Sequence, residues 1–205
     1  ATAVTPPGLL PPPPIQTPDQ AHAAWLQYGP DGPEARAVTA GACPALVIDG
    51  KAVAMQLRAP VSADFPAVCA APVPKDSTSL SIAGRTLPVP VAQPTHILVL
   101  GDTGCRIQGE TAQACNDPRA WPFAGLSAAA AALKPDLILH LGDYLYRESS
   151  CPKGNAGCAG SPHGDNWQSW NADLFAPAAP LLAAAPIIFV RGNHEDCDRA
   201  GAGYL

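Results

Sequence analysis

The fold is decided by three short apolar stretches, "HILVLGD" (96–102), "DLILHLGD" (136–143) and "PIIFVRGN" (186–193). Each of them ends in a glycine that is followed by a polar side chain. Short and nearly continuous apolar runs are typical of parallel strands that are buried on both faces. We therefore expect three buried parallel strands, with Asp102, Asp143 and Asn193 just beyond their carboxyl ends.

The segments between these stretches are compatible with helices. The segment "WPFAGLSAAAAALKP" (121–135) is rich in alanine, the strongest helix former, and it ends at Pro135. The segment 166–186 is helical in parts but is interrupted by Pro177 and Pro180. The strand–helix–strand–helix–strand order predicts an α/β domain, with helices layered on a sheet, over residues 95–205.

The polar side chains at the strand ends predict a metal site. In open parallel sheets the chemistry lies beyond the carboxyl ends of the strands, and neighbouring strands are only about 4.8 Å apart. A single Gly-Asp pair is typically an ordinary turn, but three such strand ends deliver oxygen ligands to one crevice. Tyr146, three residues after Asp143, is a fourth candidate, although a buried tyrosine is commonly a packing residue. We expect His140, also on this strand, to support the ligands rather than to bind metal.

Residues 21–92 have a different pattern, in which short apolar segments alternate with turns. Asp49-Gly50 and Ala83-Gly84 are each flanked by apolar residues, which indicates two tight hairpins. We predict a small β-rich domain that precedes the α/β domain and carries no catalytic residue.

The composition argues against several classes of function. The chain has 205 residues, a net charge of −5 and only 14% charged residues, so it has no basic patch for nucleic acid as an architectural partner. It has no run of 18 apolar residues, so no membrane span is expected. Residues 1–20 include "TPPGLLPPPP" (5–14), which predicts a proline-rich tail or linker. Nothing in the sequence indicates an oligomeric state.

Seven cysteines are a high number for a cytosolic enzyme, and their spacing does not fit structural zinc. Their positions suggest three local disulfides and leave Cys197 without a partner. The three suggested pairs are Cys43 with Cys69, Cys105 with Cys115, and Cys151 with Cys158. We therefore expect a secreted or periplasmic protein.

Three motifs at the strand ends carry a resemblance to a known family. They are "GDTG" (101–104), "GDYLY" (142–146) and "GNHE" (192–195). In this order they resemble the first three blocks of the calcineurin-like metallophosphoesterases. The purple acid phosphatase branch is the most similar, because it has GDxG where most relatives have DxH, and GDxxY where most have GDxxD.

The resemblance implies a dinuclear site, made of Fe(III) and a divalent zinc, iron or manganese ion. Asp102 would bind the ferric ion, Asp143 would bridge both metals, and Tyr146 would bind iron as a phenolate. Asn193 would bind the divalent metal and lie at the substrate, and His194 would contact the phosphate and assist the leaving oxygen. The implied reaction is hydrolysis of a phosphomonoester by attack of metal-bound hydroxide.

The sequence also departs from the family pattern. The family needs VxxH and GHxH blocks after GNHE, whereas no histidine follows His194. We therefore expect the phosphoesterase domain of 95–205 to be truncated and the chain to be a fragment. Arg106 and His163, on loops that follow strand ends, are weaker candidates for substrate binding. The alternatives are a phosphodiesterase of the same superfamily, or a non-catalytic exported binding module that acts through 21–92.

Overall fold

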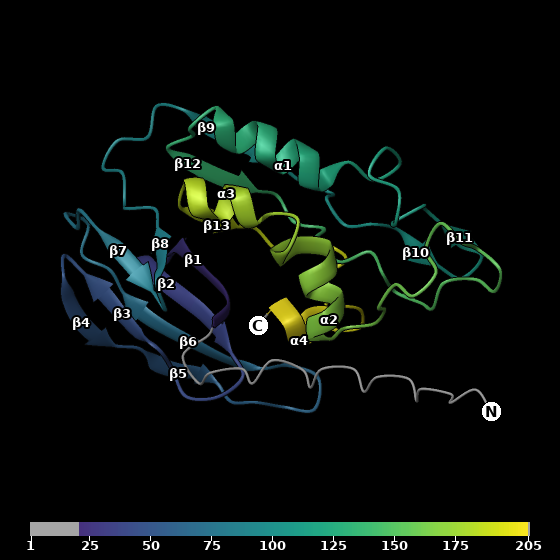
Figure 1. Ribbon diagram of the computed structural model, residues 1–205, viewed down its shortest axis with the longest axis horizontal. Coiled ribbons are helices and arrows are strands. Elements are labelled where there is room, and N and C mark those ends of the chain that lie inside the picture. Colours follow the sequence, from purple (N-terminus) through teal and green to yellow (C-terminus); the bar gives the residue numbers. More distant parts are fainter. Residues whose placement is uncertain (1–20, 205) are drawn as a thin grey trace, which may run out of the picture.

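The computed structural model describes residues 21–204, so the predicted proline-rich tail lies outside the described residues. Its largest element is a seven-stranded mixed sheet with the order β5-β6-β2-β1-β13-β12-β9 (Figure 1). In that order the strands are β5 (Gln56–Ala59), β6 (Ala67–Pro72), β2 (Gly32–Thr39), β1 (Ala21–Gly29), β13 (Ile187–Phe189), β12 (Leu137–His140) and β9 (Ile97–Leu100).

The three predicted parallel strands are confirmed as β9, β12 and β13. β12 lies between the other two and pairs with both in parallel, with Ile138 opposite Leu98 on one side and Ile187 on the other. Ile138 is fully buried, as expected for a central strand covered on its faces. The α/β class predicted for this part of the chain is confirmed.

The preceding residues are rich in strands, and part of them forms a second sheet. Its order is β4-β3-β7-β8, and its strands are β3 (Ala45–Ile48), β4 (Lys51–Ala54), β7 (Leu80–Ile82) and β8 (Arg85–Leu87). The β3–β4 hairpin turns at Asp49 and Gly50, whose φ angles are 50° and 78°. A two-residue turn with two positive φ angles matches the right-handed twist of the strands, which explains the Asp-Gly pair.

The large sheet continues across the predicted boundary between 21–92 and 95–205. β1 pairs in parallel with β13, with Gln27 opposite Ile187, so strands from both parts of the chain share one sheet. Residues 21–92 and 95–205 therefore share one sheet, and their division into two domains stays a prediction. Local sequence pattern could not show it, since the paired residues are far apart in the chain.

Helices cover one face of the sheet (Figure 1). The predicted helix of 121–135 is confirmed as α1, and the segment 166–186 is broken into three short helices, as expected. Pro180 lies in the first turn of the last of these, where its missing N–H is tolerated. The remaining elements are α1 (Phe123–Ala132), α2 (Trp167–Trp170), the π-helix η1 (Asn171–Phe175), α3 (Ala179–Ala184), α4 (Gly201–Tyr204), β10 (Ile107–Gln108) and β11 (Thr111–Ala112).

Two hydrophobic cores lie on opposite faces of the large sheet. Trp25, Ile138 and Leu174 belong to the core beneath the helices. Leu26 and Ile82 belong to the core between the two sheets. Because adjacent residues of β1 enter different cores, this strand is buried on both faces and fixes the second sheet against the first.

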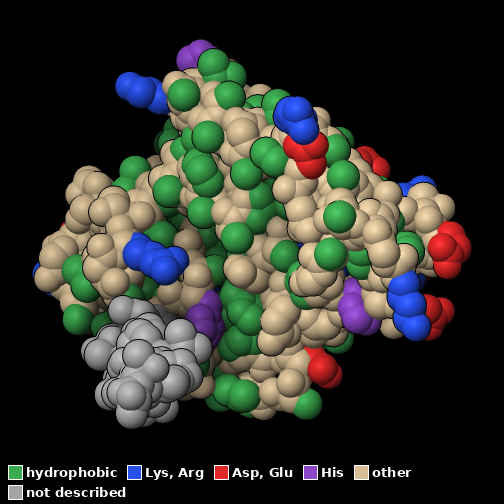
Figure 2. All heavy atoms as spheres, turned by 45° about the vertical axis from the view of Figure 1, so that its right-hand side comes forward, with side chains coloured by type: hydrophobic (Ala, Val, Ile, Leu, Met, Phe, Trp, Pro, Cys, Tyr) green, Lys and Arg blue, Asp and Glu red, His purple; other side chains and the backbone are tan. Residues whose placement is uncertain are grey.

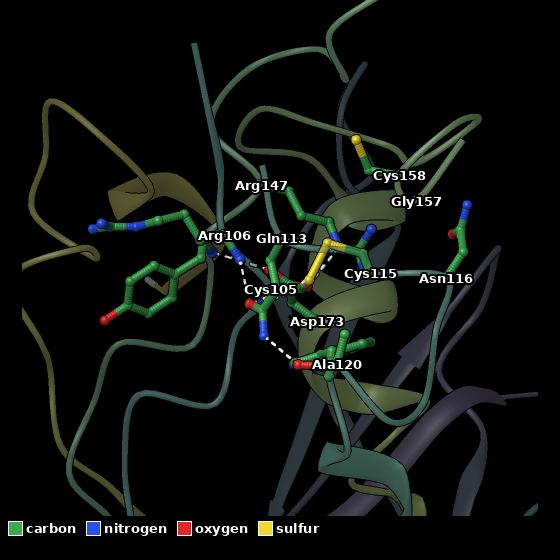
Figure 3. The surroundings of a disulfide bond; sticks show 12 residues. Cys105, Arg106, Gln113, Cys115, Asn116, Ala120, Arg147, Gly157, Cys158 and Asp173 are labelled. Carbon is green, nitrogen blue, oxygen red and sulfur yellow. Dashed lines mark hydrogen bonds and ion pairs between the residues drawn. A yellow bond between two sulfur atoms is a disulfide. The ribbon is translucent and has the colours of Figure 1, made fainter. Parts of the chain in front are cut away.

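The three suggested disulfide pairs are confirmed, and Cys197 is free and exposed. The Cys105–Cys115 bond, drawn in Figure 3, lies in a small buried cluster that also contains Cys158. Within residues 21–204, no helix has the length and apolar character that crossing a bilayer requires. On the face in Figure 2, charged side chains are few and scattered among hydrophobic and uncharged ones.

Candidate metal and phosphate site

The ends of the three parallel strands meet in one place. Asp102 follows β9 and Asp143 follows β12, and their loops are joined by two hydrogen bonds. Asp102 N donates to Gly142 O at 3.1 Å, and Thr103 N donates to Asp143 O at 3.1 Å. Both aspartates have left-handed backbone conformations, with φ of 54° and 60°. Such conformations are uncommon for residues other than glycine and are concentrated at functional sites.

Glycine is required where the loops after β12 and β13 cross. A Cβ built on Gly142 would overlap the backbone N and Cα of Gly192, and one built on Gly192 would overlap Asp143. The clashing atoms are mostly backbone atoms, which cannot move aside. The glycines of these two motifs therefore bring the loops into direct contact and set the distance between their polar side chains.

The predicted ligands converge around the phenol of Tyr146. Its hydroxyl donates toward Asp102 Oδ1 at 2.7 Å and toward Asp143 Oδ2 at 3.1 Å. The side-chain amide of Asn193, oriented to satisfy its neighbours, donates to Asp143 Oδ2 at 3.2 Å. Burial and the two carboxylates raise the pKa of Tyr146 well above its ordinary value. A cation among these oxygens would reverse that effect, because it favours the phenolate.

His194 lies against this cluster. Its backbone N donates to Asp143 Oδ1 at 3.1 Å, and its ring lies 3.8 Å from the ring of Tyr146 between centroids. The side chain is buried, and Nδ1 is 3.0 Å from Glu148 Oε1. A carboxylate at Nδ1 fixes the orientation of the imidazole ring.

Glu195 holds the loop of Asp143 in place through hydrogen bonds to its backbone. It is fully buried, and its carboxylate accepts hydrogen bonds from four backbone N–H groups. These are the N–H groups of Asp143 (2.8 Å), Tyr144 (2.8 Å), Leu145 (3.2 Å) and Gly192 (3.1 Å). The last residue of GNHE therefore ties its own loop to the GDYLY loop.

Asp173, on the π-helix η1, has a similar role that sequence reasoning missed. This fully buried carboxylate accepts from Tyr146 N at 3.0 Å, from Cys105 N at 3.1 Å and from Arg147 Nε at 2.5 Å. Figure 3 shows Asp173 and Arg147 beside the Cys105–Cys115 bond. The only sequence signal is that Asp173 is the single charged residue in the otherwise uncharged stretch 166–186.

His140 lies beside the site, and among the described residues its ring makes no hydrogen bond to the oxygen atoms of the predicted ligands. Its Nδ1 accepts from Gly142 N at 3.3 Å, so its Nε2 is placed to donate to Thr103 Oγ1 at 2.9 Å. Burial lowers the pKa of His140 to about 4, so the neutral ring that these two hydrogen bonds require is the stable form.

The two weaker substrate candidates have different surroundings. The guanidinium of Arg106 lies 5.8 Å from the centre of the Tyr146 ring, at the edge of the cluster. Figure 3 shows its side chain extending away from the disulfide. His163 is exposed, and among the described residues no hydrogen bond or ion pair reaches its ring. The structure thus brings Arg106 to Tyr146, whereas no contact within the described part of the chain links the ring of His163 to the other candidates.

Two further residues contact His194 and were missed by sequence reasoning. Arg199 Nη2 lies 3.0 Å from Nδ1 and 3.2 Å from Nε2 of His194, and it is paired with Glu148. Arg199 Nη1 lies 3.1 Å from the amide oxygen of Asn193. Glu148 is held in turn by Gln108 Nε2 at 2.9 Å. No motif marks these residues, because their contacts form only when the loops fold together.

The donor set fits a hard cation. Within the described residues, no group of three or more His, Cys, Asp and Glu side chains is arranged to hold a metal. The cluster instead combines two carboxylates with a phenol and a carboxamide. Oxygen donors of this kind suit hard cations, and a tyrosinate is a known ligand of ferric iron.

The comparisons agree with these motifs. The model of the calcineurin-like phosphoesterases matches residues 95–204, which is more than half of the chain. The chain therefore belongs to the calcineurin-like phosphoesterase family. No curated protein matches it.

One solved structure similar to this chain is that of purple acid phosphatase PPD1 from yellow lupin (Lupinus luteus) seeds. The two are 12% identical, with a TM-score of 0.48, over 84% of this chain and 35% of the lupin chain. This chain thus matches about a third of the lupin protein's length.

Proposed function

We propose that the chain carries part of a metal-dependent phosphoesterase site of the purple acid phosphatase type, which hydrolyses phosphomonoesters. The observation that carries this proposal is the position of Tyr146, whose hydroxyl lies within 3.1 Å of carboxylate oxygens of both Asp102 and Asp143. A phenol placed between two carboxylates at the ends of parallel strands is expected for a ferric tyrosinate site.

Each predicted ligand has a role in this proposal. Asp102 and Tyr146 would hold Fe(III), Asp143 would bridge the two metals, and Asn193 would bind a divalent zinc, iron or manganese ion. When bound, such a metal pair neutralises charge on the phosphoryl group and generates hydroxide near neutral pH. The glycine crossing and the carboxylate of Glu195 fix the backbone of Asp143, which supports this role for its side chain.

His194 is proposed to act on the leaving group. Its ring is buried against Tyr146 and its Nδ1 lies beside Glu148, which holds the imidazole at the edge of the cluster where the leaving oxygen would depart. Asn193 and His194 both contact Arg199, so their side chains lie at the same edge of the cluster. Arg106, near Tyr146, is a second positive group for the phosphate.

The proposal is tested by hydrolysis of 4-nitrophenyl phosphate and of bis(4-nitrophenyl) phosphate by the chain after loading with iron and zinc. We expect the wild-type chain to bind metal, and any turnover of the monoester to depend on that metal and to fall at least 100-fold in Asp143→Asn. The control is Asp76→Asn. Asp76 is an exposed residue in a turn outside the three motifs, so its substitution should not change turnover.

Failure of the folded wild-type chain to bind metal would contradict the proposal. Turnover that survives chelation or Asp143→Asn would contradict the proposal. Faster cleavage of the diester would favour the phosphodiesterase alternative. The three disulfides support the further proposal that the protein is secreted or periplasmic, because such bonds persist in oxidising compartments.

A further inference from the structure

We propose that Arg199 binds the phosphoryl group of the substrate and makes the site selective for dianionic monoesters. The inference rests on the proposed function, and it adds a substrate-binding residue that lies outside the three motifs. The guanidinium of Arg199 contacts both residues proposed to lie at the substrate. Its Nη1 is 3.1 Å from the Asn193 amide oxygen, and its Nη2 is 3.0 to 3.2 Å from the ring nitrogens of His194.

Two other arginines near the site have partners of their own, and Arg106 lies only at the ring of Tyr146, with 5.8 Å between its guanidinium and the ring centre. Arg147 is buried and paired with Asp173. Arg191 donates from Nε to Glu195 O at 2.6 Å and lies over the ring of Tyr204. Among the described residues, Arg199 is the arginine that hydrogen-bonds to both His194 and Asn193.

Glu148 holds the guanidinium in this position. Its Oε1 pairs with Arg199 and also lies 3.0 Å from His194 Nδ1, while its Oε2 accepts from Gln108 Nε2 at 2.9 Å. The backbone of Glu148 is fixed as well, because its N donates to Ile107 O at 2.9 Å. A guanidinium anchored on a rigid loop loses little side-chain freedom when an anion binds.

Arg199 keeps donors free for an anion. A guanidinium carries five N–H donors. Contacts to Glu148, His194 and Asn193 account for three of them, so two remain. The side chain is 28% exposed, whereas that of His194 is 6% exposed, so an anion reaches the guanidinium from solvent.

This position explains a preference for monoesters. The guanidinium lies against the ring edge of His194, where the leaving oxygen is expected, so an oxygen of the same phosphoryl group comes within its reach. A monoester dianion has three non-bridging oxygens and two charges, whereas a diester has two such oxygens and one charge. A fixed guanidinium therefore favours the monoester, because charge-assisted hydrogen bonds are the strong ones.

The test is a calorimetric titration at pH 8 with inorganic phosphate, and separately with dimethyl phosphate as the monoanionic diester. It uses the 205-residue chain after loading with iron and zinc. We expect Arg199→Gln to raise the Kd for phosphate about 10- to 100-fold, the usual loss for a hydrogen bond between charged groups. The Kd for dimethyl phosphate should rise less than about 3-fold, and Arg199→Lys should recover part of the loss.

Controls separate binding from folding. Arg119→Gln removes an exposed arginine that pairs only with Asp117 among the described residues, and it should leave both Kd values unchanged. Thermal unfolding of each variant shows whether the fold is retained. If Arg199→Gln unfolds the chain, the phosphate affinity of Arg199→Lys is used in its place. Lysine keeps the positive charge but lacks the planar guanidinium, so its Kd for phosphate should still rise.

The outcomes distinguish this inference from the proposed function. Unchanged phosphate affinity in folded, metal-loaded Arg199→Gln overturns the assignment of Arg199 and leaves the metal site standing. Equal losses for phosphate and dimethyl phosphate overturn the selectivity. Failure of the wild-type chain to take up metal contradicts the proposed function. In that case phosphate is titrated into the metal-free wild-type chain and into its Arg199→Gln variant. If neither binds phosphate, or both bind it equally well, the inference is overturned as well.

Discussion

Gly104 lies directly against Tyr146, and the two motifs that contain them form a single steric unit. A Cβ built on Gly104 would lie 2.6 Å from Cδ2 of Tyr146 and 2.9 Å from its backbone N. A Cβ there would also lie 2.6 Å from the backbone O of Tyr144, so the last glycine of GDTG allows the close approach of both the backbone of GDYLY and the Tyr146 ring.

Replacing Gly104 by alanine should displace Tyr146 and the loop that carries it. The added methyl group meets backbone atoms as well as the ring, so we expect the free energy of unfolding to fall by about 2 kcal/mol or more. Denaturant unfolding measures this change. Gly125→Ala is the matched control, because a Cβ there meets nothing within 4 Å and lies in α1. That control should stabilise the chain slightly, by about 0.5–1 kcal/mol.

Replacing Glu195 by glutamine tests the anchor of the Asp143 loop. The substitution keeps the size of the side chain but removes the charge and turns one acceptor into a donor that faces N–H groups. We expect a loss of about 2–4 kcal/mol in the free energy of unfolding, since four backbone N–H groups lose a charged acceptor. Glu110→Gln changes an exposed carboxylate and should have little effect. Equal effects of the two substitutions would contradict the role of Glu195.

Replacing Asp173 by asparagine tests the connection between η1 and the Tyr146 loop. The change leaves the guanidinium of Arg147 buried without its charge partner, which typically costs about 3–5 kcal/mol of stability. Thermal unfolding provides the measurement. Asp117→Asn breaks the exposed pair with Arg119 and should scarcely change the melting temperature. A small effect at Asp173 would mean that the loop is held by other contacts.

The stability of the chain should depend on His140 below pH 6.5. Burial lowers the pKa of His140 to about 4, whereas an unfolded histidine has its ordinary pKa near 6.5. Between these values the unfolded state binds the proton and the folded state does not, so stability falls as the pH falls. We expect His140 to contribute a loss of about 2 kcal/mol between pH 7 and pH 5.

Denaturant unfolding at both pH values, compared with His140→Gln, isolates this contribution. The variant retains a donor for Thr103 but does not titrate, so its stability should fall less over the same interval. An identical fall in both proteins would show that His140 is not the group responsible.

Sequence reasoning predicted the three strands, and the convergence of the four predicted ligands at their ends, because the signals for them are local. Apolar runs that end in Gly-Asp or Gly-Asn identify β9, β12 and β13, and parallel strands bring their ends together whatever the details of the loops. The two hairpin turns were equally local, since Asp49-Gly50 specifies its own backbone conformation.

The remaining features depend on contacts between distant segments. The pairing of β1 with β13 joins strands that nothing in their local sequence links. Asp173 and Arg199 act through residues more than 25 positions away, apart from the local contacts of Arg199 with GNHE. A lone acidic residue in an apolar helix is a signal for the first of these. Arg199 carries no comparable signal, because a charged residue in a turn is ordinarily exposed.

The most direct test of the ferric site is the visible absorption and metal content of the 205-residue chain after anaerobic loading with iron and zinc, followed by oxidation, with Tyr146→Phe measured alongside. We predict a coloured wild-type protein with bound iron, and loss of the visible band in the variant, because the colour comes from a tyrosinate on Fe(III). A band of equal strength in Tyr146→Phe, or a folded wild-type protein that binds iron without colour, would contradict the proposed ferric tyrosinate site.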